Sequence, residues 1–203
     1  MYFDEFCERV KELTDNNTKY NSSNYVIYGN LALKYIYNYI ISKSNVYYST
    51  LLKDIQVVSE YVLPNNFVSI YNIYKKDGSG RFDFLDIDKF LDIPPSNSYT
   101  IFNSNELVFT ENNYGDIVNI VYFRKPTLIY NEEIKLDKEE YQLIDVPFCC
   151  ENLLIFKAVS YINARDEKDN ELIELKTKEE LTLIDMYLTK ISRRNSKKLE
   201  NVY

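Results

Sequence analysis

The order of apolar patterns along the chain is the feature that most restricts its fold. Short apolar runs separated by turn-forming residues fill the middle of the sequence, and apolar residues at helical spacing precede and follow them. No long helical pattern lies between the central runs. This order argues against a doubly wound parallel sheet, in which strands alternate with helices. It favours an antiparallel β region set between helical segments.

Five short apolar runs make up the predicted β region. They are Phe67 to Tyr74, Arg81 to Ile87, Tyr99 to Phe102, Glu106 to Thr110 and Ile117 to Phe123. Gly-, Pro- and Asn-containing turns separate these runs, as expected for hairpins that close into a small sandwich or barrel. Pro64 ends the segment before them and favours an extended Leu63.

The first 60 residues are predicted to be mostly helical. Phe3, Phe6 and Val10 recur at helical spacing, and a second helix is expected after the capping residues Ser22 and Ser23. The apolar residues of the next element fit either a short helix or a strand rich in β-branched residues. These residues are Leu51, Leu52, Ile55 and Val58.

Helical spacing returns after residue 136, with one predicted helix from Glu151 to Asn163. Thr177 and Glu180 have the spacing of a capping box for a last helix. An apolar stripe for packing against another helix follows. It consists of Leu181, Ile184, Leu188 and Ile191.

These patterns predict an α+β fold, a helical bundle with an inserted antiparallel β subdomain. The expected boundaries are 1–60 for the N-terminal helices, 61–130 for the β subdomain and 131–203 for the C-terminal helices with a basic tail. No long linker separates these parts, so we expect one composite domain.

The absence of histidine excludes several kinds of active site. The 203 residues contain no His and three Cys, so no imidazole-based triad and no His-ligated zinc or haem site is possible. Cys7, Cys149 and Cys150 cannot form a four-thiolate site, and the adjacent pair is poorly placed for a disulfide. We expect reduced, mostly buried thiols, a cytoplasmic origin, and no cofactor or metal.

The formal net charge of −7 disfavours tight binding of nucleic acid, because such proteins carry a basic surface. The first residues include Asp4, Glu5 and Glu8, so no signal peptide is expected. No uncharged stretch is long enough for a membrane span. Tyrosine is abundant, with 20 residues, and this residue type is enriched at protein interfaces.

Three groups of residues have a composition that could support chemistry. Asp77–Gly80 has glycines like a phosphate loop but lacks its Gly-Lys-Ser/Thr ending, so a hairpin turn is the better interpretation. Asp86, Asp88 and Asp92 are spaced a little like calcium ligands, without the loop glycine or closing glutamate. The third group is an acidic cluster formed by Glu132, Glu133, Asp137, Glu139 and Glu140.

Carboxylate pairs of that kind serve glycoside hydrolysis, but any acidic chain offers them. We therefore predict no catalytic residue and no enzyme. Positive residues gather near the end of the sequence, either as a solvated helix end or as a tail that docks on an acidic partner. They are Lys190, Arg193, Arg194, Lys197 and Lys198.

The order of three short motifs resembles that of a known family. Tyr61-Val-Leu63-Pro64-Asn-Asn-Phe67 precedes a strand, Val121-Tyr122-Phe-Arg-Lys125-Pro126 follows later, and Val146-Pro147 leads into a helix. Over residues 24–195 the chain resembles the head–tail connector proteins of tailed bacteriophages, the adaptor or ring proteins that include tail tubular protein A. The Asn-, Tyr- and Ile-rich composition suits the AT-rich crAss-like phages.

The resemblance implies a structural virion protein without enzymatic activity. Such proteins form rings, typically of twelve subunits, between the portal protein and a further ring or tail nozzle protein. They assemble in the bacterial cytoplasm and extend the channel through which DNA passes without specific binding. In this family the segment that follows Lys190 often reaches the portal.

Two alternatives remain beside the connector ring. One is another tail-completion or tail-assembly protein, which would have a different stable partner. The other is a carboxylate-dependent hydrolase of cell-wall glycan, which would need two carboxyl groups in unlike environments. For the ring, the apolar stripe from Leu181 to Ile191 would serve either the subunit core or the contact between subunits.

Overall fold

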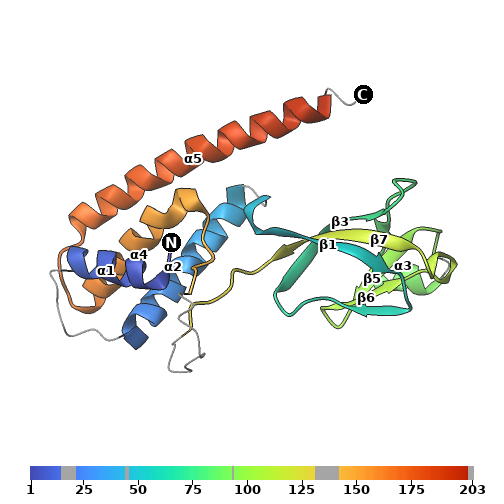
Figure 1. The fold of residues 1–203 in the computed structure, drawn as a ribbon, viewed down its shortest axis with the longest axis horizontal. Helices are drawn as coiled ribbons and strands as arrows, with labels where there is room; N and C mark the ends of the chain where they lie inside the picture. Colours follow the sequence, from blue (N-terminus) through green and yellow to red (C-terminus); the bar gives the residue numbers. More distant parts are fainter. Residues whose placement is uncertain (15–21, 44–45, 93, 131–141, 201–203) are drawn as a thin grey trace. The chain divides into compact units, whose positions relative to one another are not determined.

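The chain consists of two compact units (Figure 1). The structure, a computed structural model, describes residues 1–14, 22–43, 46–92, 94–130 and 142–200, with the backbone alone for residues 22, 46 and 191–200. The helical unit comprises Met1–Tyr47 and Pro126–Tyr203, and the β unit, Tyr48–Lys125, is inserted between them. The predicted α+β class, a helical bundle carrying an inserted β subdomain, is confirmed.

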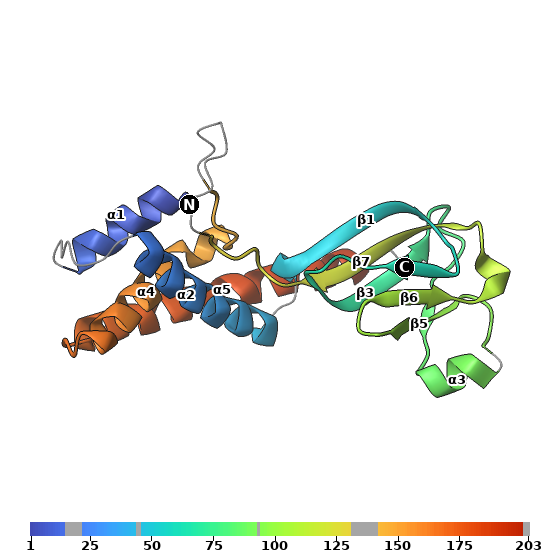
Figure 2. The ribbon, with the colours of Figure 1, turned by 90° about the horizontal axis from the view of Figure 1, so that it is seen from below.

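The helical unit is built around one central helix, α4. Helix α4 (Glu151–Arg165) contacts α1 (Phe3–Leu13), α2 (Ser22–Lys43) and α5 (Glu171–Glu200). In Figure 1 α5 runs above α4, and Figure 2 shows from below how α2 crosses these helices. The buried side chains of α4 are Leu153, Leu154, Ile155, Ala158, Val159, Ile162 and Asn163. This helix is buried on most of its surface because three others cover it.

The chain that returns from the β unit is fixed to α2. The Asn30 side-chain amide donates to the Ile129 carbonyl oxygen at 2.7 Å, and its Oδ1 accepts the Ile129 N–H at 2.8 Å. At Gly29 a Cβ atom would lie 2.7 Å from Ile129 Cδ1 and 3.2 Å from the Phe6 ring, so a larger residue there would require these side chains to shift. Asn30 and Ile129, which are distant in sequence, thereby join the two chain segments of the helical unit.

The β unit is a sandwich of two sheets and not a closed barrel. The three-stranded sheet has the order β1 (Ser49–Gln56), β7 (Ile117–Arg124), β3 (Phe67–Lys75). The four-stranded sheet has the order β2 (Glu60–Val62), β6 (Glu106–Phe109), β5 (Ser98–Phe102), β4 (Asp83–Phe84). One buried cluster lies between them. It contains Val57, Leu63, Ile73, Phe82, Tyr99, Leu107, Phe109, Val118 and Ile120.

One strand pair departs from the antiparallel prediction. β4 and β5 are parallel, because the short helix α3 (Ile87–Asp92) lies between them and gives the chain length for a crossover. The predicted strand from Arg81 to Ile87 is therefore reduced to β4 and the start of α3.

The β unit also begins earlier than predicted, at Tyr48 rather than residue 61, and ends at Lys125 rather than residue 130. The open choice over Leu51 to Val58 is settled as strand β1. A bulge shifts the register between Leu52 and Ile55. The extra residue lets both of these side chains pack against the core. This bulge gives a strand the three-residue spacing of a helix.

The predicted capping box at Thr177 is wrong. Helix α5 begins six positions earlier in the sequence, at Glu171, whose N–H donates to Asp169 at 2.9 Å. Thr177 lies inside this helix, and its hydroxyl donates to the Ile173 carbonyl oxygen at 2.7 Å. A threonine that satisfies its hydroxyl in this way is tolerated within a helix. Within the described residues, no helix is both long and apolar enough to cross a bilayer.

Candidate functional site

Residues of the first two motifs behind the resemblance lie close together in the β unit, near its last residue, Lys125. The Pro64 carbonyl oxygen accepts the Phe67 N–H at 2.8 Å, which closes a turn before β3. The Lys125 N–H donates to the Asn66 carbonyl oxygen at 2.8 Å. The Phe67 ring lies 5.9 Å from the Tyr122 ring, measured between centroids. These two motifs, distant in sequence, are therefore neighbours in the β unit.

The remaining motif residues are structural as well. Leu63 is buried in the sandwich core, and Tyr61 in β2 packs against the same cluster. Pro126 is the first residue of the helical unit after β7. The contacts of the motif residues are thus a turn, a backbone hydrogen bond and aromatic and apolar packing within the β unit.

The predicted helical stripe belongs in part to the subunit core. Ile184 and Leu188 are buried and Leu181 is half-buried on α5. The side chain of Ile191 lies outside the described residues. The described members thus pack within the helical unit, as the core interpretation of the stripe requires.

A second apolar line on α5 was missed by the sequence analysis. Leu172 is 62% exposed and Leu183 is 58% exposed, and Leu175 and Met186 are also exposed. Leu172 and Leu183 are 11 residues apart, as are Leu175 and Met186. This interval completes three turns of a straight helix. We call these four residues with Glu179, which lies among them, the α5 outward face. This 11-residue interval is the signal in the sequence from which the exposed face could have been predicted.

The predicted basic tail lies on the last part of α5. The backbone of this part is helical up to Glu200. Lys190 is exposed. The side chains of Arg193, Arg194, Lys197 and Lys198 lie outside the described residues, so their role as a docking tail stays a prediction.

A thiol cluster lies beside the start of α4. The Sγ atoms of Cys149 and Cys150 are 3.8 Å apart and the thiols are free. Hydrogen bonds from the Cys150 thiol and the Tyr47 hydroxyl lower the pKa of Cys149 to about 7, although burial opposes them. The hydrogen bond to Cys149, with burial, raises the pKa of Cys150. The pKa values of the two adjacent thiols are therefore unequal. The expectation that most thiols are buried is wrong, because only Cys150 is buried and Cys7 and Cys149 are half-buried.

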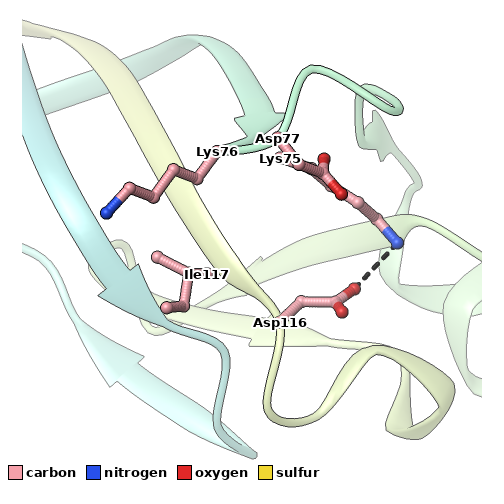
Figure 3. A pocket seen from close by; sticks show the side chains of 5 residues that line it. All are labelled: Lys75, Lys76, Asp77, Asp116 and Ile117. Atoms are coloured by element: carbon pink, nitrogen blue, oxygen red, sulfur yellow. Dashed lines mark ion pairs between the residues drawn. The ribbon is translucent and has the colours of Figure 1, made fainter.

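An open pocket of about 430 Å³ lies at the end of β3 and the start of β7 (Figure 3). Lys75, Lys76, Asp77, Asp116 and Ile117 line it. Lys75 Nζ is 2.8 Å from Asp116 Oδ2. This hydrogen bond holds the pKa of Asp116 below its ordinary value. The amine of Lys76 pairs with Asp54 at 2.8 Å.

The pocket therefore holds charges that neutralise one another. The pKa of the exposed Asp77 is lowered, first by the Ser79 side chain and then by its N–H, which donates to Asp77 at 2.9 Å. Gly78 has φ +76°, and Lys75 N–H donates to the Gly80 carbonyl oxygen at 2.9 Å. Asp77–Gly80 is thus a turn, as predicted. Neither Asp77 nor Asp116 has the raised pKa of a general acid.

The other acidic candidates do not form a site in the described residues. Asp88 and Asp92 lie on α3 and Asp86 just before it. No group of three His, Cys, Asp or Glu side chains is placed to hold a metal ion in the part of the chain that the structure describes. The predicted acidic cluster from Glu132 to Glu140 lies outside the described residues.

Comparison with known proteins adds no family assignment. No protein-family model matches the chain, and no curated protein matches it in sequence. Function must therefore be inferred from the surfaces of the molecule itself.

Proposed function

We propose that the chain is a structural subunit of a phage head–tail connector, which forms a ring between portal and tail and has no enzymatic activity. The observation that carries the proposal is the α5 outward face. A subunit that exposes four apolar side chains on one helix face gains free energy when a partner covers them.

Two further features support this proposal. The motifs on which the resemblance depends are joined in space, through the Phe67–Tyr122 contact and the Lys125–Asn66 hydrogen bond. The negative net charge of the chain also supports the proposal, because a ring of twelve subunits would carry a formal charge of about −84. Carboxylates along a channel repel DNA phosphates and keep passage smooth, whereas Lys and Arg would bind them. A channel lined by Lys and Arg would contradict this part of the proposal.

The experiment is a nonsense mutation of the gene in the phage that encodes the chain. We expect filled heads that carry a portal but no tail, and that lose their DNA, with tails restored when the chain is supplied in trans. Complete particles that contain DNA and adsorb to cells would contradict the connector role. Complete particles that adsorb but fail to penetrate the cell wall would instead favour the hydrolase.

A further inference from the structure

We infer that the α5 outward face of one copy binds the exposed side of α2 of the next copy, with Glu179 paired to Lys34. This inference rests on the proposed ring and names the contact between its subunits. It joins two different surfaces of the same chain, the arrangement from which rings are closed.

The α5 outward face lies on the side of the helix away from its own core. At about 100° per residue, the middle of this face, Glu179, lies roughly 120–180° around the helix from the buried Ile173, Ile184 and Leu188. Glu179 is exposed, with an apolar pair on either side of it along the helix. The face thus offers two apolar pairs around one negative charge.

The exposed side of α2 offers the complementary pattern. Ile27 is 55% exposed, Leu31 is 45% exposed, and Lys34 follows on the same side of the helix. These residues are opposite to the buried Ile36 and Ile40. Helix α2 contains no acidic residue, so this side offers one apolar pair followed by one positive charge.

The two patterns have the same length. Ile27 and Lys34 are seven residues apart, as are Leu172 and Glu179, and Glu179 and Met186. Each interval is about 10.5 Å along a helix. When Glu179 of one copy contacts Lys34 of the next, the apolar pair of α2 therefore lies beside one of the two apolar pairs of α5, whether the two helices run parallel or antiparallel. Neither Lys34 nor Glu179 has an ion-pair partner in the described part of the chain.

Pairing of α5 with a second α5 is less favourable. Glu179 lies midway between the two apolar pairs. Both the parallel and the centred antiparallel arrangement would place Glu179 against Glu179, and like charges in contact are destabilising. Contact with α2 instead replaces that repulsion by attraction.

Charge reversal in the full-length chain tests this contact. We expect Glu179→Lys and Lys34→Glu each to weaken self-association about tenfold in sedimentation velocity, and the double variant to restore it. Glu174→Lys is the matched control, because it makes the same change on another side of α5. Single reversals without effect, a double variant that stays weak, or a wild-type chain monomeric at every concentration would overturn the inference.

A second measurement does not depend on these variants. A carbodiimide joins a carboxylate directly to an amine when the two are in contact. In an equal mixture of ¹⁴N- and ¹⁵N-labelled wild-type chains, we expect a crosslinked peptide of mixed isotope that joins Lys34 to Glu179. Oligomers without that peptide, or the peptide in single-isotope form alone, would overturn the inference.

Failure of this contact is distinguishable from failure of the ring. If Glu179→Lys and Lys34→Glu still join the portal in the wild-type copy number, the inferred contact is wrong and the connector role stands. If the wild-type chain forms the mixed crosslink but the nonsense mutant makes complete, infectious particles, the self-association stands and the connector role is wrong.

Discussion

The two units of the chain differ in whether certain exposed apolar side chains have a packing partner in the same unit. In the β unit, two exposed aromatic residues have ring partners in the same unit: Tyr71 lies 5.4 Å from Phe123 and Phe84 lies 5.7 Å from Tyr99, between ring centroids. In the helical unit, the α5 outward face has no such support and instead repeats along one helix. These two rings are thus covered in part within the β unit, whereas the four apolar side chains of the α5 outward face are available for a partner to cover.

The largest expected effect is a loss of stability when a residue in the core of the β unit is truncated. Phe109 is buried and its ring meets Phe82 at 5.3 Å, so Phe109→Ala should lower the free energy of unfolding by about 3–5 kcal/mol. Chemical denaturation monitored by circular dichroism measures this. Phe148→Ala is the control, because Phe148 is 87% exposed. An equal loss in both variants would contradict the assignment of Phe109 to a closed core.

The second prediction concerns a buried amide that closes one end of the β unit. Asn113 accepts from the Thr110 hydroxyl at 2.7 Å and donates to Asn97 at 2.8 Å and to Asp116 at 3.2 Å. Asn113→Ala leaves these partners unpaired, and we expect a loss of about 2 kcal/mol. The neighbouring exposed Asn112, replaced by Ala, should change stability little. If the two variants melt alike, the network does not stabilise the turn.

The third prediction concerns the unequal thiols of the helical unit. Because the pKa of Cys149 is lowered to about 7 and burial raises that of Cys7 to about 12, iodoacetamide should alkylate Cys149 first. The rate of Cys149 alkylation should be half-maximal near pH 7, and the Cys7 thiol should stay protonated below pH 9. Tyr47→Phe removes a hydrogen bond to the thiolate, so it should raise the pKa of Cys149 and slow alkylation at pH 7. Peptide mass spectrometry measures each rate, and a Cys149 midpoint near pH 9 would contradict the assignment.

The smallest effect is expected where α2 meets α5. Asp185 accepts from the Tyr39 hydroxyl at 2.6 Å and pairs with Lys43 at 3.4 Å. Because this pair is well exposed, Asp185→Asn should cost only about 0.5 kcal/mol, measured by thermal unfolding. Glu174→Gln removes a charge elsewhere on α5 and serves as the control. A loss several times larger would mean that this contact, and not α4, holds α5 in place.

Local signals in the sequence were sufficient for four of the strands. β3, β5, β6 and β7 were predicted within a residue or two of their observed bounds, because Gly- and Asn-rich turns separate them. β1 remained open between helix and strand because its bulge inserts an extra residue and imitates helical spacing. The parallel β4–β5 pair could not be predicted, since it depends on where α3 leads the chain.

The surfaces were harder to predict than the fold. The buried stripe of α5 was found from its spacing, but the line on the opposite side was missed, because a sequence does not say which of two apolar faces is covered. The junction of the Phe67 and Tyr122 motifs depends on strand pairing between distant segments. The inequality of Cys149 and Cys150 requires Tyr47, which is about 100 residues away in sequence.

The most direct test of the connector role is native mass spectrometry of the full-length chain mixed with the portal ring encoded by the same genome. We expect a complex in which twelve copies of the chain are bound to one portal ring. A chain that remains monomeric in the mixture, with the portal ring unchanged in mass, would contradict it.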